Sequence, residues 1–177
     1  MDGSSGARSA WPGRVAIIDQ ADAAGSLTPL LTAHGIAFQV IPETSSGTDR
    51  SAATTDDADL TIRLLPDGAD SVQLAAGDST VAGVRMTMLT HAPGAVEIVR
   101  CTGTSAGTID QARSLFSSLG RRTLVVEPAP GLYIGRVCRA YLNEGMALVG
   151  DGIPAARVES ASVEAGMAAG PLEILDE

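Results

Sequence analysis

The hydrophobic period of this chain changes between residues 123 and 149. Residues 123–126 form a short run rich in β-branched side chains, which is typical of a strand, and Pro130-Gly131 follows soon after as a break. From Tyr133 onward the apolar residues recur at helical spacing. The sequence therefore predicts a strand that leads through a Pro-Gly corner into a long helix.

One side of this long helix is expected to be buried. Its apolar residues are Ile134, Val137, Cys138, Tyr141, Met146, Leu148 and Val149. Among them, Tyr141 and Met146 are expected to lie in a core or at a dimer face. Asp151-Gly152 ends the helix, and a second helix is predicted at 155–165.

A third helix opens at Gly170-Pro171, and the chain leaves it unfinished at Glu177. This ending indicates a helical domain that is longer in nature or is completed by a partner.

Strand and helix signals alternate before the Pro-Gly corner. Strands are predicted at 14–18, 36–41, 60–65, 71–75, 81–89 and 95–99, and helices at 26–34 and 105–120. The first strand, helix and strand fit within about 30 residues, the size of a βαβ unit with parallel strands. Residues 43–58 are polar and turn-rich, so an exposed loop is expected there. These signals predict an α/β region followed by an α-helical one.

Charge and composition exclude several classes of function. The net charge is −9 and basic residues do not cluster, which argues against a nucleic-acid or anionic membrane partner. All 12 basic residues are arginine, so lysine chemistry such as a Schiff base is excluded. Cys101 and Cys138 are too few for a disulfide scaffold or zinc site, and two reduced, packed thiols in a cytoplasmic protein are expected. No apolar run reaches the roughly 18 residues of a membrane span.

Two overlapping stretches resemble the 3-hydroxyacyl-CoA dehydrogenases of fatty-acid and aromatic-acid degradation. Residues 83–131, GVRMTMLTHAPGAVEIVR and onward, are similar to the end of that family's nucleotide-binding domain. Residues 130–177, PGLYIGRVCRAYLNEGMALVGDG and onward, are similar to the opening of its C-terminal helical domain. The likeness extends from about Ala82 to Glu177.

The resemblance implies a fold and a domain organisation. It implies a reduced Rossmann-like, mostly parallel sheet at 14–126 and an all-α dehydrogenase segment at 127–177, apparently incomplete, after a flexible tail at 1–13. Trp11 is the apolar exception in that tail and is expected to pack against the domain. The region is similar to the degenerate second Rossmann-like copy of the 3-hydroxybutyryl-CoA and phenylacetate-pathway types.

The family's chemistry needs a histidine base that is oriented by a glutamate, with a serine and an asparagine positioning the substrate. By resemblance, the catalytic glutamate falls on Glu97, the histidine on Arg85 and the asparagine on Gly135, whereas the serine has no counterpart that aligns. An arginine stays protonated and cannot act as the base. Glu97 is either a surviving catalytic residue or a solvated or salt-bridged strand residue. Arg85 is either a ligand for a CoA phosphate or a surface or ion-pair residue.

The family's cofactor is NAD, bound at a G-x-G-x-x-G turn after the first strand. Here the corresponding residues are Asp19-Gln20-Ala21-Asp22-Ala23-Ala24, which lack all three glycines. The carboxylates of Asp19 and Asp22 would repel the phosphates of the cofactor. The resemblance therefore implies NAD for the family, but this chain is expected to bind none.

Several functions remain open at this point. The first is a non-catalytic, supporting part of a dehydrogenase that forms a homo-oligomer or binds a catalytic homologue. A second is an active NAD-dependent oxidoreductase with a rearranged site, in which His91 would be the base, although His91 reads more simply as a loop residue. A third is an acyl-CoA binding module that has kept the acyl groove without the redox chemistry.

Overall fold

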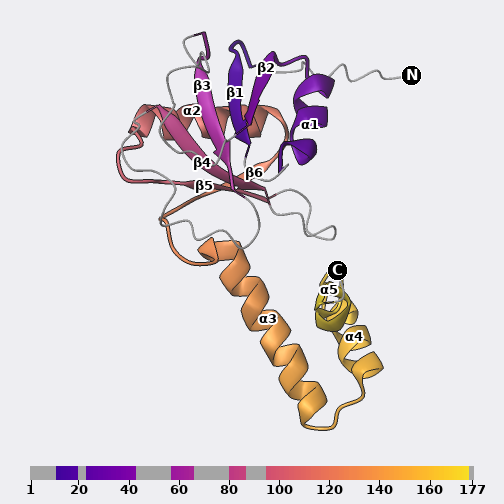
Figure 1. Ribbon diagram of the computed structural model, residues 1–177. Coiled ribbons are helices and arrows are strands. Elements are labelled where there is room, and N and C mark those ends of the chain that lie inside the picture. Colours follow the sequence, from indigo (N-terminus) through magenta and orange to yellow (C-terminus); the bar gives the residue numbers. More distant parts are fainter. Residues whose placement is uncertain (1–10, 20–22, 43–56, 66–79, 87–94, 176–177) are drawn as a thin grey trace, which may run out of the picture.

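A computed structural model describes residues 11–19, 23–42, 57–65, 80–86 and 95–175. The described strands form one sheet in the order β2-β1-β3-β4-β5-β6 (Figure 1). Neighbouring strands pair in parallel, except that β4 and β5 are antiparallel. The strands are β1 (Val15–Asp19), β2 (Phe38–Pro42), β3 (Leu60–Leu64), β4 (Val81–Met86), β5 (Ala95–Val99) and β6 (Arg122–Val126). The prediction of a mostly parallel α/β sheet is confirmed.

The helices also lie close to their predicted positions. They are the 3-10 helix η1 (Ala23–Ser26), α1 (Thr28–Ala33), α2 (Ala106–Ser118), α3 (Leu132–Gly150), α4 (Ala155–Glu164) and α5 (Pro171–Leu175). The strand predicted at 71–75, the end of the one predicted at 81–89 and most of the loop predicted at 43–58 lie outside the described residues. The domain boundary at 126/127 stays a prediction.

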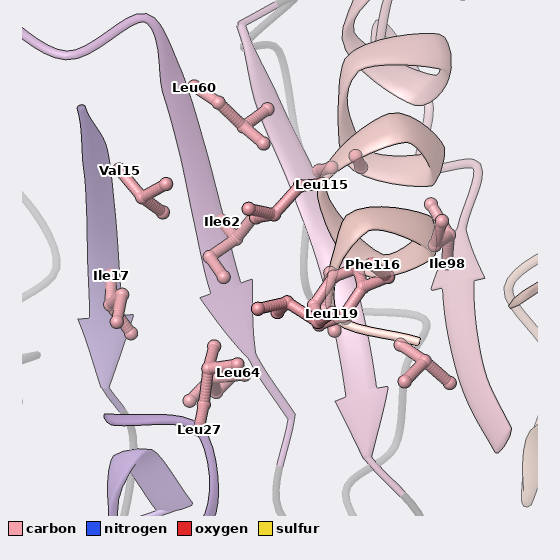
Figure 2. Close-up of a cluster of buried hydrophobic side chains, with 14 of the residues drawn as sticks. Val15, Ile17, Leu27, Leu60, Ile62, Leu64, Ile98, Leu115, Phe116 and Leu119 are labelled. Atoms are coloured by element: carbon pink, nitrogen blue, oxygen red, sulfur yellow. The ribbon is translucent and has the colours of Figure 1, made fainter. Parts of the chain in front are cut away.

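The main hydrophobic core fills one face of the sheet. Strand residues at alternate positions, such as Ile62 and Ile98, point to this face, where they meet Leu115 and Phe116 of α2 (Figure 2). Leu27 and Leu31 of the α1 region are fully buried in the same cluster. Trp11 packs against the cluster as well, as expected from its apolar character.

The helix α3 forms as predicted, but its apolar side is buried only in part: Ile134, Cys138 and Tyr141 are half-buried. Only Leu132 and Gly145 of α3 are buried. Val137 is 52% exposed and Met146 45% exposed. The reason is visible in Figure 1, where α3 extends away from the sheet and only α4 and α5 return alongside it. Helical spacing identified apolar residues on α3, and the described part of the chain covers them only in part.

The three C-terminal helices, α3, α4 and α5, hold one another in place, and we refer to them as the helical arm. The Tyr141 hydroxyl donates a hydrogen bond to the Ala169 carbonyl at 2.9 Å. Glu159 of α4 accepts a hydrogen bond from the Leu172 amide at 2.8 Å, which satisfies a free N–H at the start of α5. Gly145 lies so close to Pro171 that a Cβ at this position would overlap the proline ring.

Among the described helices, none combines the length and hydropathy of a membrane span.

Replacing Gly145 by alanine tests this packing. The added methyl would push Pro171 and α5 away from α3, and overpacking of this kind costs about 1–3 kcal/mol. The matched control is Gly150→Ala at the end of the same helix, where a Cβ would meet no atom within 4 Å. Chemical denaturation should show a loss of stability for Gly145→Ala and none for Gly150→Ala. Equal behaviour of the two variants would contradict the packing described here.

Candidate functional site

The antiparallel register of β4 and β5 places Arg85 directly opposite Glu97. Both side chains point to the sheet face opposite the main core, because their neighbours Val84 and Ile98 point into that core. Arg85 donates two hydrogen bonds to Glu97 Oε2, from Nε at 2.9 Å and from Nη2 at 2.6 Å. The Glu97 side chain is 0% exposed and that of Arg85 8%. Of the alternatives for these two residues, the structure therefore shows a buried ion pair.

The second carboxylate oxygen of Glu97 caps the helix α3. Oε1 accepts hydrogen bonds from the backbone amides of Tyr133 at 2.7 Å and Ile134 at 2.8 Å. The residue at the N-cap position, Gly131, has no side chain to do this. A negative charge is also favoured at a helix N-terminus by the helix dipole. Glu97 therefore supplies from β5 the cap that the local sequence of α3 lacks.

The Pro-Gly corner brings the start of α3 to this carboxylate. Gly131 has φ +73°, a left-handed conformation that glycine adopts without a steric penalty. The next residue, Leu132, has φ +48°, which is unfavourable for a residue with a Cβ. Its side chain is buried with Leu65, Val99 and Cys101. This apolar contact holds the corner in a conformation that leucine would otherwise avoid.

Arg85 also contacts the corner and the first turn of α3. Its Nη2 donates a hydrogen bond to the Gly131 carbonyl at 3.1 Å. Gly135 faces the guanidinium group, and a Cβ at Gly135 would lie 3.1 Å from Nη2. The structure thus brings together Arg85, Glu97 and Gly135, the three positions to which the resemblance assigns the family's histidine, glutamate and asparagine.

The Arg85–Glu97 pair holds the start of α3 in place, but it offers no proton acceptor comparable to a histidine. Guanidinium groups only donate hydrogen bonds and stay charged. Both oxygens of Glu97 already accept hydrogen bonds, two from Arg85 and two from the helix. His91, the alternative base, lies outside the described residues, and the catalytic role of Glu97 stays a prediction.

Sequence reasoning missed the capping role of Glu97. A signal was present, because a helix that begins after Pro-Gly has no Ser, Thr, Asp or Asn at its N-cap and must satisfy its free amides in another way. What the local sequence does not reveal is which distant residue provides the cap. Glu97 lies 36 residues before Tyr133.

A backbone amide shortly after β1 is already engaged by a carboxylate of the chain itself. Asp19 Oδ1 accepts a hydrogen bond from the Ala24 amide at 3.1 Å. In a dinucleotide-binding turn, such amides and the helix N-terminus are directed at phosphate. Here a carboxylate of the chain itself takes this amide, and α1 begins only at Thr28. Residues 20–22 lie outside the described part.

The two cysteines are free thiols, as predicted. Cys101 is buried, and burial raises its pKa above the usual thiol value. Cys138 lies in α3, and burial raises its pKa too, with a smaller opposing effect from the Arg85 charge. Raised pKa values keep both groups protonated at neutral pH, so neither is an activated nucleophile.

The described residues also contain no group of three or more potential metal ligands among His, Cys, Asp and Glu.

Solved structures of several dehydrogenases are similar to this chain in fold. (S)-3-hydroxybutyryl-CoA dehydrogenase PaaH1 from Ralstonia eutropha is 16% identical, with a TM-score of 0.59 over 90% of this chain and 80% of that protein. The 3-hydroxybutyryl-CoA dehydrogenase of Escherichia coli K12 is 19% identical, with a TM-score of 0.62 over 91% of this chain and 48% of that protein. This chain therefore shares their fold.

A further similar structure is a 5-formyl-3-hydroxy-2-methylpyridine 4-carboxylic acid 5-dehydrogenase, an NAD⁺-dependent dismutase. It is 19% identical, with a TM-score of 0.54 over 85% of this chain and 69% of that protein. No family model matches the sequence. The likeness confirms the Rossmann-like fold that the sequence resemblance predicted.

Replacing Glu97 by glutamine tests the buried ion pair. The variant leaves the Arg85 charge buried without its partner, and breaking a buried pair in this way costs about 3–5 kcal/mol. Glu127→Gln is the control, because Glu127 pairs with Arg100 at 3.5 Å on the surface, where such pairs contribute about 0–1 kcal/mol. Urea denaturation followed by circular dichroism measures both. A Glu97→Gln variant as stable as the control would contradict the geometry.

Proposed function

We propose that this chain is a non-catalytic, supporting member of the 3-hydroxyacyl-CoA dehydrogenase family. In the family reaction, a 3-hydroxyacyl-CoA is oxidised to a 3-oxoacyl-CoA while NAD accepts a hydride. The observation that carries the proposal is the buried Arg85–Glu97 ion pair, because it stands where the resemblance places the catalytic histidine and glutamate. An arginine at the position of the base leaves the 3-hydroxyl without a group to take its proton.

Two further positions support the loss of chemistry. Gly135, at the position of the substrate-binding asparagine, has no side chain that could hold a substrate carbonyl or hydroxyl. Asp19 takes the Ala24 amide and places negative charge near the position of the cofactor phosphates. We therefore propose that the chain neither binds NAD nor turns over the family's substrates.

The supporting role we propose is association through the helical arm. The arm exposes large apolar side chains that a partner could cover: Tyr133, Val137, Met146, Leu148, Val149, Val163, Met167 and Leu175. Tyr133, Val137 and Leu148 share one side of α3 by helical spacing, and contiguous exposed apolar surface is typical of interaction sites. The partner is a second copy of this chain or a catalytic dehydrogenase with a similar arm.

Sedimentation velocity tests the association. We expect the wild type to sediment as a dimer, or to form a complex with a catalytic 3-hydroxyacyl-CoA dehydrogenase when the two are mixed. Val137→Glu should abolish either complex, because it places a charge on the apolar face of α3. Ser114→Glu, on the exposed side of α2, is the charge-matched control and should leave the complex intact. A monomer that binds neither partner would contradict the proposal.

Calorimetric titration tests the loss of redox chemistry. We expect no heat of binding with NADH at millimolar concentration, and no NADH formation from NAD and 3-hydroxybutyryl-CoA. NADH binding with turnover that is lost in His91→Ala would contradict the proposal and support the active enzyme with a rearranged site. Binding of acetoacetyl-CoA without NADH binding would instead support the acyl-CoA binding module.

A further inference from the structure

The contact between the helical arm and the sheet depends on few residues. Within the described part of α3, only Leu132 and Gly145 are buried, and Gly145 packs on Pro171 of the arm itself. The described contacts that join α3 to the sheet include the buried Leu132 and the polar contacts of Arg85 and Glu97. Those polar contacts are the hydrogen bonds from Arg85 to Glu97 and Gly131 and from the start of α3 to Glu97.

We propose that Arg85, Glu97 and Gly135 form a latch that fixes the helical arm on the sheet, and that Arg85 and Gly135 are a matched pair. A Cβ at residue 135 would force the guanidinium group to shift by a few tenths of an ångström from its present position. This inference concerns how the arm is held, and it does not depend on whether the protein dimerises or binds NAD.

Gly135 packs closely against the guanidinium group of Arg85. A Cβ there would lie 3.1 Å from Arg85 Nη2, 3.4 Å from Nη1 and 3.7 Å from Cζ. The first distance is shorter than ordinary van der Waals contact between a carbon and its neighbours. The guanidinium cannot readily move away, because Nε and Nη2 are both bonded to the fully buried Glu97 carboxylate. A side chain at 135 would therefore act directly on the ion pair.

Gly135 lies inside the helix α3, where glycine is an unfavourable residue. Glycine in a helix interior is less favourable than alanine by about 1 kcal/mol, which is roughly a fivefold change in the folding equilibrium. Gly135 has a φ outside the left-handed region, so its backbone does not require glycine. Among the described residues, the close contact with Arg85 is what favours glycine at position 135.

A double-mutant cycle tests whether Gly135 is needed to make room for Arg85 or has no such role. In the wild-type background, Gly135→Ala should lower the folding equilibrium constant by fivefold or more, because the methyl displaces the guanidinium. In the Arg85→Ala/Glu97→Gln background, which removes both charges and opens space, the same change should raise the constant about fivefold. Gly150→Ala should have one and the same effect in both backgrounds. Stabilisation by Gly135→Ala in both backgrounds would overturn the proposal.

Hydrogen exchange provides a second readout if the double variant does not fold. The amides of Tyr133 and Ile134 are protected by their hydrogen bonds to Glu97. In Gly135→Ala alone, these two amides should exchange at least tenfold faster than in the wild type, whereas the amide of Ile62 in the sheet should change less. Unchanged exchange at Tyr133 and Ile134 would overturn the latch, since a displaced guanidinium must disturb the carboxylate that both amides share.

Discussion

The carboxylate of Glu97 is the group on which the joint between sheet and helices depends. A fully buried charge is very costly unless donors surround it. Glu97 meets this requirement with two hydrogen bonds from Arg85 and two from the backbone of α3. The start of α3 must therefore lie over β5, because moving it would leave a buried oxygen without donors. The Pro-Gly corner delivers the start of α3 to this carboxylate, and the buried side chain of Leu132 holds the corner in its positive φ.

The same contacts limit the chemistry that this position can perform. In the family that the sequence resembles, a glutamate here orients a histidine that must be free to accept a proton. In this chain the glutamate faces a permanently charged guanidinium, and its remaining oxygen belongs to the helix cap. A carboxylate engaged on both oxygens contributes to structure whether or not a substrate is present. Fold and chemistry therefore separate at this site, as they do between many proteins that share a fold.

Sequence patterns predicted the elements well because those patterns are local. Short apolar runs marked β3 and β5, and helical spacing marked α2 and α3, each within a single segment. The grouping of Arg85, Glu97 and Gly135 was accessible only through the resemblance, since the three residues come from different elements. Helix capping by Glu97 and the exposure of Val137 were not predicted, because periodicity defines a face without identifying what will contact it. These properties depend on strand register and on partners outside the segment.

The helix α5 is capped in the same way as α3, by a glutamate from another element. Glu159 caps α5 from α4, just as Glu97 caps α3 from β5, so both helix starts are held by a carboxylate from another element. Tyr141 and the close contact of Gly145 with Pro171 then fix α3 against α5. An arm ordered in this way presents its apolar side chains without first having to fold. Since ordering a surface on association costs free energy, a preformed apolar face is better suited to bind a partner than a flexible one with the same residues.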